Sequence, residues 1–268
     1  EFISPLVFET LTGNKCYVDT FDRNFKFDVE HISLAKKADI FMIAPATANV
    51  IAKIANGIAD DMLTTTFLAS KCKKIVSPAM NTAMFENQIT QDNIAKLKKY
   101  GIGVVEPRNG LLACGDTGAG KMPEPDFLFD VIEREIAREK DMLGKKVLVT
   151  SGATMESLDP VRFLTNHSSG KMGFAIAKED MLRGAEVTVV KANTTAEIPN
   201  FVKIVEVSSA KDMFDAVTAL SDQQDIIVKA AAVADYTPES YVDSKIKKKD
   251  GDLSIPLKRT MDILKYLG

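Results

Sequence analysis

Short apolar segments alternate with amphipathic segments along most of this chain. Apolar runs of strand length are typical of strands buried on both faces, whereas an apolar repeat of about 3.6 residues predicts a helix. In the first half, the pattern predicts strands at 38–44, 74–76 and 103–106 and helices at 50–59, 91–100 and 126–140. In the second half, it predicts strands at 147–150, 186–190, 202–207 and 225–231 and helices at 173–183 and 210–221. We therefore expect an α/β protein with helices around parallel, Rossmann-like sheets.

The chain is long enough for two such units. It has 268 residues, of which 46% are hydrophobic, which is somewhat more than one average domain requires. The charged helix at 126–140 ends the first pattern, and Gly144 precedes the second. We expect one domain at 1–140 and another at 141–268. Because the chain begins at Glu1 without methionine and stops directly after a helical pattern, we also expect it to be a fragment truncated at both ends.

Composition narrows the class of partner. The net charge of −3 argues against nucleic-acid binding, which usually requires an excess of basic residues, and favours small-molecule substrates. Three cysteines at 16, 72 and 114 form no close metal-binding spacing, and an odd number fits a reducing cytoplasm. We find neither an apolar run long enough to cross a bilayer nor a secretory signal. We expect a cytoplasmic protein with no membrane partner.

The segment from Lys146 to Val190 predicts a nucleotide site. A strand leads to Gly152, and the small residues from Ser168 to Gly173 lead into an Ala-rich helix, so backbone N–H groups are free to meet an anion. In an ordinary dinucleotide fingerprint the glycines follow the strand directly, but here about fifteen residues intervene. They include Asp159, Arg162 and Asn166, a polar set that suggests chemistry. The alternative is a surface loop with ordinary turn residues.

In the first half, small and amide residues follow two predicted strands. Residues 44–49 (APATAN) and 77–81 (SPAMN) should meet at one rim of a parallel sheet and could line a pocket for a flat ring. Taken singly, each is more often a turn or a helix cap. His31, before the first strand, has a side chain suited to proton handling, although a lone histidine is often structural. Cys114 lies in a Gly/Pro-rich stretch at 112–125 that indicates a mobile flap, so its thiol could reach a substrate.

A carboxylate and a lysine cluster follow the last predicted strand. The segment 229–236 (KAAAVADY) ends near Asp235, and Lys245 begins a run of lysines ten residues later. Ammonium groups can neutralise a triphosphate, and a carboxylate can orient ribose hydroxyls or a magnesium ion. By itself, a short lysine run is usually a solvated loop.

Together, these motifs resemble a known family. The block from Glu30 to Leu34 and the 45–49, 78–81 and Cys114 segments look like the flavin-dependent cysteine decarboxylases, and the second unit looks like phosphopantothenate-cysteine ligase. The resemblance covers essentially the whole chain, in the domain order of the bifunctional coenzyme A biosynthesis enzymes. It implies a flavodoxin-like flavin decarboxylase unit followed by a nucleotide-binding ligase unit.

For the first unit, the resemblance implies FMN-dependent decarboxylation of 4'-phosphopantothenoylcysteine to 4'-phosphopantetheine. His31 would act beside the flavin, Asn81 would hold the substrate carboxylate, and Cys114 would return a proton to the enethiol intermediate as reduced flavin is reoxidised. The FMN site would comprise Thr47, Asn49, Pro78, Ala79 and Met80. The family also has an N-terminal Gly-rich turn that binds FMN phosphate, and this chain lacks it. Flavin sites in the family lie between subunits, so we expect a homo-oligomer.

For the second unit, the resemblance implies ligation of cysteine to 4'-phosphopantothenate through an acyl-cytidylate, with CTP as co-substrate and Mg²⁺. Lys245 would catalyse the first step, and Asn166 would handle the acyl-cytidylate. The CTP site would comprise Lys245 together with Ser168, Gly170, Lys229, Ala230, Ala231, Asp235, Met261, Asp262, Ile263 and Leu264.

Two other functions are compatible with parts of the sequence. A non-catalytic regulatory subunit that binds flavin or nucleotide would keep the pockets but would not need Cys114, Asn166 or Lys245. A flavodoxin-like electron carrier would explain only the first unit. We therefore favour the bifunctional enzyme.

Overall fold

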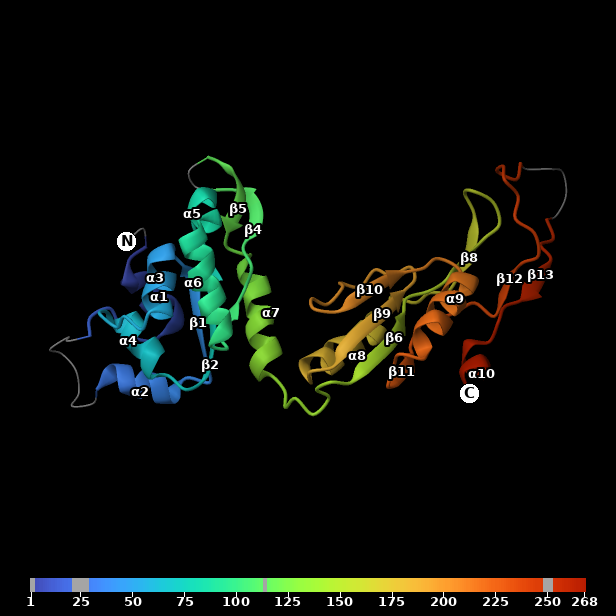
Figure 1. The fold of residues 1–268 in the computed structure, drawn as a ribbon. Helices are drawn as coiled ribbons and strands as arrows, with labels where there is room; N and C mark the ends of the chain where they lie inside the picture. Colours follow the sequence, from blue (N-terminus) through green and yellow to red (C-terminus); the bar gives the residue numbers. More distant parts are fainter. Residues whose placement is uncertain (1–2, 21–28, 113–114, 248–252) are drawn as a thin grey trace. The chain divides into compact units, whose positions relative to one another are not determined.

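The computed structural model describes residues 3–20, 29–112, 115–247 and 253–268. Two compact units divide the chain, Glu1–Ile132 and Glu133–Gly268 (Figure 1). Each contains its own parallel sheet, which confirms the predicted α/β class. Within the described residues, no helix is long and apolar enough to span a membrane.

The first unit is built on three parallel strands in the order β1-β2-β3. Helices α1 and α2 precede β1, helices α3 to α6 lie between strands, and a two-stranded antiparallel hairpin, β4–β5, follows β3. The elements are α1 (Pro5–Thr12), α2 (Glu30–Lys37), β1 (Ile40–Ala46), α3 (Ala48–Ala55), α4 (Met62–Ala69), β2 (Lys73–Pro78), α5 (Thr82–Glu86), α6 (Gln88–Lys99), β3 (Gly103–Val104), β4 (Arg108–Leu111), β5 (Thr117–Lys121) and α7 (Pro125–Ile136), which continues into the second unit.

Packing of two helices on the sheet forms the main core of this unit. Ile43 of β1 and Val76 of β2 pack against Ile51 of α3 and Leu97 of α6, and all four side chains are at most 4% exposed. These positions come from the apolar runs and the helical repeats of the sequence. Because both strands are parallel, their carboxyl ends lie at the same rim of the sheet.

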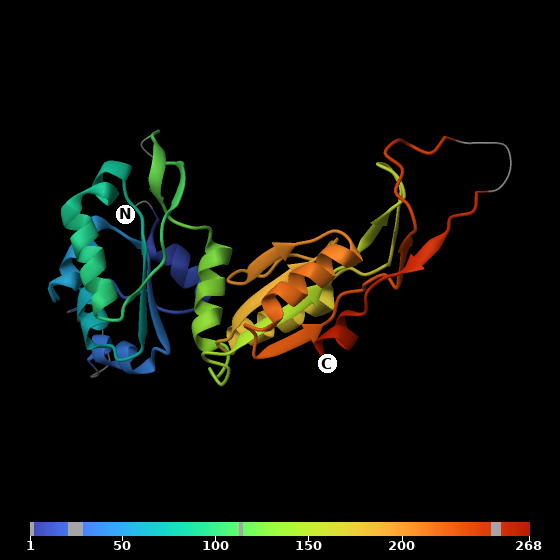
Figure 2. The same ribbon diagram turned by 45° about the vertical axis from the view of Figure 1, so that its right-hand side comes forward.

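The predicted flap contains a strand that the sequence did not indicate. We predicted a mobile flap at 112–125, and residues 117–121 of it form β5, which pairs with β4 through Gly110 and Gly118. Two of the five residues of β5 are glycines, which are depleted in strands, so the segment carries little strand signal and the pairing is visible only in three dimensions. The hairpin projects beyond the carboxyl end of the sheet, beside α5, in both views (Figures 1 and 2).

The second unit is built on four parallel strands in the order β10-β9-β6-β11. Helices α8 and α9 pack on this sheet, and two antiparallel hairpins extend beyond it. The elements are β6 (Lys146–Ser151), β7 (Met155–Ser157), β8 (Phe163–Thr165), α8 (Lys171–Leu182), β9 (Glu186–Lys191), β10 (Lys203–Glu206), α9 (Ala210–Ser221), β11 (Ile226–Lys229), β12 (Tyr236–Pro238), β13 (Leu257–Arg259) and α10 (Ile263–Leu267).

The insertion between β6 and α8 is not an open loop. Met155 pairs with Thr165 and Ser157 with Phe163, so β7 and β8 form a hairpin whose turn contains Asp159. A second ladder joins β12 to β13. The last expected strand, at 225–231, ends earlier, at Lys229, because the N–H groups of Ala230 and Ala231 both donate to Thr150 Oγ1 at 3.2 Å.

Candidate functional site

Three loops meet at the carboxyl rim of the first sheet. The Ala79 N–H donates to the Ala46 carbonyl at 3.0 Å, which joins the loop after β2 to the end of β1. The Met80 N–H donates to the Gly120 carbonyl at 3.1 Å, which joins the same loop to β5. We call this region, residues 44–49, 77–82 and 115–121, the three-loop rim.

Asn81 connects the rim to the hairpin through its side chain. Its Oδ1 accepts the Ala83 N–H at 2.9 Å and caps α5, and its Nδ2 donates to Asp116 Oδ2 at 3.3 Å. Asp116 is two residues beyond Cys114, which lies outside the described residues. Sequence reasoning missed Asp116, although an acidic residue among the glycines of the flap was a usable signal.

The other expected flavin residues have varied settings. Thr47 and Asn49 are exposed at the start of α3, where Thr47 Oγ1 accepts the Val50 N–H at 3.3 Å. Pro78 is buried at the end of β2. Among the described residues, Ser77 Oγ and Thr82 Oγ1, on either side of residues 78–81, are buried without a hydrogen-bond partner. Such orphaned polar groups are uncommon in folded proteins and often mark a functional site.

His31 does not join the three-loop rim within this chain. It lies near the start of α2, and α2 lies beside the opposite end of the sheet in both views (Figures 1 and 2). Only Ala38 and Asp39 separate α2 from β1, so the helix must lie near the end at which β1 begins. We had expected His31 next to the flavin, and the geometry places it elsewhere in this protomer.

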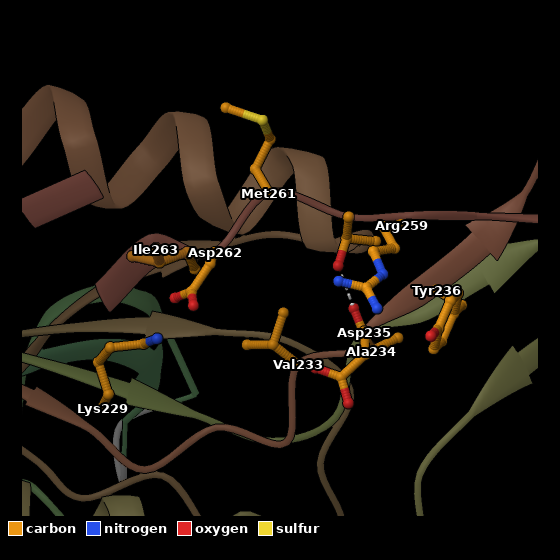
Figure 3. A pocket seen from close by; sticks show the side chains of 10 residues that line it. Lys229, Val233, Ala234, Asp235, Tyr236, Arg259, Met261, Asp262 and Ile263 are labelled. Carbon is orange, nitrogen blue, oxygen red and sulfur yellow. Dashed lines mark hydrogen bonds between the residues drawn. The ribbon is translucent and has the colours of Figure 1, made fainter. Parts of the chain in front are cut away.

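The second unit holds a cavity of about 410 Å³ beyond β11. Five of the residues expected to bind CTP contribute to its wall, and five others were not predicted. The lining comprises Lys229, Asp235, Met261, Asp262 and Ile263, together with Val233, Ala234, Tyr236, Arg259 and Thr260 (Figure 3). Leu264 is 65% exposed and does not line it.

Backbone contacts shape this cavity. The Thr260 N–H donates to the Asp235 carbonyl at 3.0 Å, and Thr260 Oγ1 donates to the Ala234 carbonyl at 2.6 Å. The Lys229 ammonium and the Asp262 carboxylate point into the same space (Figure 3). A cation, two carboxylates and Arg259 around one cavity can bind a ligand that carries both phosphate and hydroxyl groups.

Asn166 and the small residues before α8 lie at the carboxyl end of the second sheet. Asn166 Nδ2 donates to the Ala232 carbonyl at 3.3 Å. Gly170 is buried with φ at +77°, and its carbonyl accepts a bond from Ser151 Oγ at 2.9 Å. Ser168 Oγ accepts the Gly170 N–H at 3.4 Å. A side chain at Gly170 would collide with Thr194, so this turn requires glycine.

Lys245 does not line the cavity. We had expected it to share a strand end with Asp235, but the chain between them forms β12 and leads toward the turn of the β7–β8 hairpin. There the Ile246 N–H donates to Asp159 Oδ2 at 3.0 Å. In the part of the chain that the structure describes, no three His, Cys, Asp or Glu side chains are grouped as metal ligands.

Two family models match the chain. A flavoprotein model matches residues 1–137, and a model described as the DNA/pantothenate metabolism flavoprotein C-terminal domain matches residues 142–268. The coenzyme A biosynthesis bifunctional protein CoaBC of Haemophilus influenzae is 39% identical over all of this chain and 67% of its own length. This chain belongs to the family of coenzyme A biosynthesis bifunctional proteins.

Other family members show the same relation. The CoaBC protein of Bacillus subtilis is 44% identical over 100% of this chain and 66% of its own length. A crystal structure of the C-terminal domain of a CoaBC protein is 46% identical, covers 47% of this chain and 59% of that chain, and has a TM-score of 0.42. This chain thus spans about two thirds of the length of its curated relatives in the family.

Proposed function

We propose that this chain carries two reactions of coenzyme A biosynthesis. The first unit decarboxylates 4'-phosphopantothenoylcysteine with FMN, and the second ligates cysteine to 4'-phosphopantothenate with CTP. The observation that carries the proposal is the three-loop rim, where the Asn81–Asp116 bond joins the loop after β2 to the segment that bears Cys114. Membership of the bifunctional family supports the pairing of the two activities.

The rim fits an isoalloxazine ring. Ala44 and Ala79 leave space for a flat ring near the backbone, and Thr47 and Asn49 are exposed beside them. Among the described residues, the buried Ser77 hydroxyl has no hydrogen-bond partner. FMN bound there would supply the oxidation of the cysteinyl thiol that eases CO2 loss.

The side chains of the rim have separate roles in this proposal. The Asn81 amide holds the substrate carboxylate, with Asp116 orienting its Nδ2. Cys114 gives a proton to the enethiol, and the flavin reduced in the first step would supply the hydride that completes this reduction. His31 lies away from the rim of its own protomer, so the proposal requires a second copy to deliver it. A homo-oligomer is therefore part of the proposed active site.

In the second unit, the cavity beyond β11 binds CTP. Lys229 and Arg259 face phosphate oxygens, and Asp235 and Asp262 accept bonds from sugar or base groups. Because Ala230 and Ala231 already donate their N–H groups to Thr150, their carbonyl oxygens are the backbone groups left to bind the base. Mg²⁺ would enter with the triphosphate, and Asn166 and Lys245 would act on the acyl-cytidylate and on its formation, respectively.

The decarboxylase is tested with Asn81→Asp. Aspartate is also a good N-cap, so α5 should keep its start, but a second carboxylate beside Asp116 would repel the substrate carboxylate. We expect CO2 release from 4'-phosphopantothenoylcysteine by the FMN-loaded chain to fall at least about a hundredfold. Asn87→Asp is the matched control, because Asn87 caps α6 in the same way, with Oδ1 3.0 Å from the Ile89 nitrogen. Equal loss in both variants would refute the role of Asn81.

The two activities are separated with Cys114→Ser. This change should leave CTP-dependent pyrophosphate release unaltered and should stall the decarboxylase after CO2 loss, with the enethiol accumulating. Completion of the reduction at the normal rate would refute the thiol's role. Binding of FMN and CTP without turnover of either substrate would instead identify the chain as a regulatory binding module.

A further inference from the structure

A second cavity, of about 440 Å³, lies in the first unit away from the three-loop rim. Its wall is formed where α3 and α6 end and where β2 begins, which is the amino end of the sheet. The apolar part of the wall comes from Ile54, Ile58, Phe67, Leu68 and Ile102. Within one protomer, the three-loop rim is at the other end of the same strands, and none of its residues lines this cavity.

Lys74 and Lys96 are the charged residues of the lining, which contains no carboxylate. Lys96 Nζ donates to Asn56 Oδ1 at 2.9 Å, and its charge offsets the partial negative charge at the end of α6. Lys74 belongs to a strand, where there is no such helix charge to offset.

Within the described residues, the Lys74 ammonium has no anionic partner. Its Nζ lies 5.0 Å from the centroid of the buried Phe67 ring, and no carboxylate pairs with it among the described residues. Burial lowers the pKa of Lys74 below its ordinary value. A half-buried cation over an aromatic face gains from an anion brought into the same low-dielectric space.

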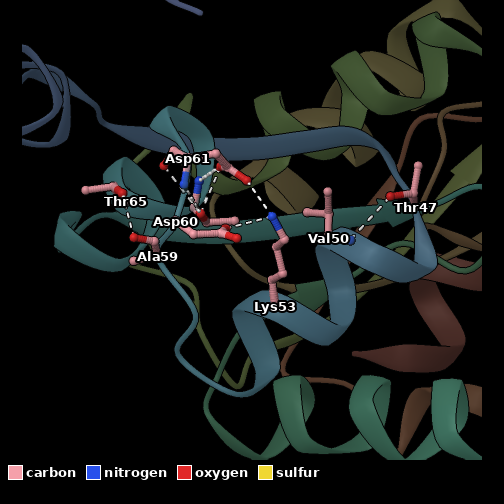
Figure 4. Close-up of polar contacts among 8 residues, drawn as sticks. Thr47, Val50, Lys53, Ala59, Asp60, Asp61 and Thr65 are labelled. Atoms are coloured by element: carbon pink, nitrogen blue, oxygen red, sulfur yellow. Dashed lines mark hydrogen bonds and ion pairs between the residues drawn. The ribbon is translucent and has the colours of Figure 1, made fainter. Parts of the chain in front are cut away.

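A neighbouring lysine shows the difference. Lys53, one residue before Ile54, lies 2.7 Å from Asp60 and 3.0 Å from Asp61 (Figure 4). Its hydrogen bond to Asp60 raises its pKa. Among the described residues, the fold thus supplies two carboxylates to Lys53, just outside the cavity, and none to Lys74 on its wall.

We infer that this cavity binds a small organic carboxylate, with its apolar body between Phe67, Leu68 and Ile102 and its carboxylate paired with Lys74. Cavities of several hundred Å³ with apolar walls and one or two charged groups are typical small-molecule sites. The inference is independent of both proposed reactions.

The chain contains no tryptophan, so a single Tyr100→Trp substitution on the cavity wall provides a specific reporter. Titration of this variant with octanoate should change its emission saturably, whereas octanol, of the same length but uncharged, should bind at least tenfold more weakly. Adding Lys74→Gln should weaken octanoate binding about tenfold, equal to about 1.4 kcal/mol, and leave octanol binding unchanged.

The controls make the outcome decisive. Lys99→Gln removes a neighbouring exposed charge that does not line the cavity, and it should leave both titrations unchanged. Retained octanol binding shows that the Lys74→Gln variant is folded. Equal affinities for octanoate and octanol, insensitivity of octanoate to Lys74→Gln, or absence of both an emission change and binding heat would overturn the inference.

Discussion

Asp159 is the residue that ties together two distant parts of the second unit. Its side chain is buried, and its Oδ1 accepts the N–H groups of Val161 and Arg162, both at 2.8 Å. Its Oδ2 accepts the Ile246 N–H at 3.0 Å. The carboxylate thereby closes the β7–β8 turn and fixes the backbone next to Lys245, which is a positioning role in the proposed ligation.

Asp159→Asn should release this segment. The amide keeps the size of the side chain but loses the charge, and it turns a donor toward one of the N–H groups that the carboxylate accepts. We expect trypsin to cut after Lys245 several-fold faster than in the unaltered chain, as followed by mass spectrometry. Asp243→Asn, an exposed change in the same segment, should leave the rate unchanged. Equal rates for the two variants would show that Asp159 does not hold the segment.

The same contact predicts a pH dependence. The Ile246 N–H, with those of Val161 and Arg162, holds the pKa of Asp159 below its usual range. A folded-state pKa below the unfolded one gives stability that is present above the unfolded value, about 3.9, and is lost as pH falls through the folded value. Hydrogen exchange at Ile246, corrected for its intrinsic rate, should therefore show constant protection from pH 7 to about pH 4 and a decrease only below it. A decrease between pH 7 and pH 5 would contradict this assignment.

At the scale of elements, α8 lies unusually close to β6. A Cβ built at Gly173 would lie 2.7 Å from Ser151 Cβ and 3.0 Å from the Thr150 carbonyl oxygen. Gly173 is in the first turn of α8, so the absence of a side chain sets how near the helix and the strand can approach.

Gly173→Ala tests this packing because two effects oppose each other. In an open helix, alanine would stabilise by up to about 1 kcal/mol relative to glycine. The clash with backbone and Ser151 should outweigh that gain, and we expect a net loss of about 1–3 kcal/mol in the free energy of unfolding. Urea titration measures it, with Met172→Ala, at a neighbouring position that is 67% exposed, as control. A more stable Gly173→Ala variant would mean that the helix is free to move away from the strand.

Some helices and strands could be predicted from the sequence and others could not. The regular βα repeats were foreseeable because one apolar run is enough to identify a strand and one helical repeat is enough to identify a helix. Helix α9, for example, has the predicted bounds, 210–221. The three antiparallel strand pairs outside the parallel sheets, β4–β5, β7–β8 and β12–β13, were missed, because their strands are short and gain stability only from their partners. No element was predicted at 62–69, where α4 contains three consecutive threonines, which favour strands.

In the candidate sites, too, what local pairing determines was predictable and what distant contacts determine was not. The meeting of the loops after β1 and β2 follows from parallel pairing alone. The position of Lys245 could not be foreseen, because it depends on β12 and on the hydrogen bond that the neighbouring Ile246 N–H donates to Asp159, 87 positions earlier in the chain than Ile246. We did not predict that His31 lies at the other end of the sheet in its own protomer, because a sequence motif does not state which end of a sheet its helix occupies.

At the scale of the whole molecule, each unit has its own core. Ile43, Ile51 and Val76 belong to a cluster within the first unit, and Val147, Val189 and Met213 belong to clusters within the second. Units with separate cores can unfold in separate steps, each responding to the ligand that binds it.

We therefore expect calorimetry of the chain to resolve two unfolding transitions. A ligand that binds only the folded state adds about 2.7 kcal/mol of stability at a hundred times its Kd. CTP with Mg²⁺ should raise one midpoint and FMN the other, and Gly173→Ala should lower only the CTP-responsive transition, because Gly173 packs within the second unit. If calorimetry shows a single transition and both ligands raise its midpoint, the two units unfold as one. If it shows two transitions and both ligands raise the midpoint of the same one, the assignment of one ligand to each unit is contradicted.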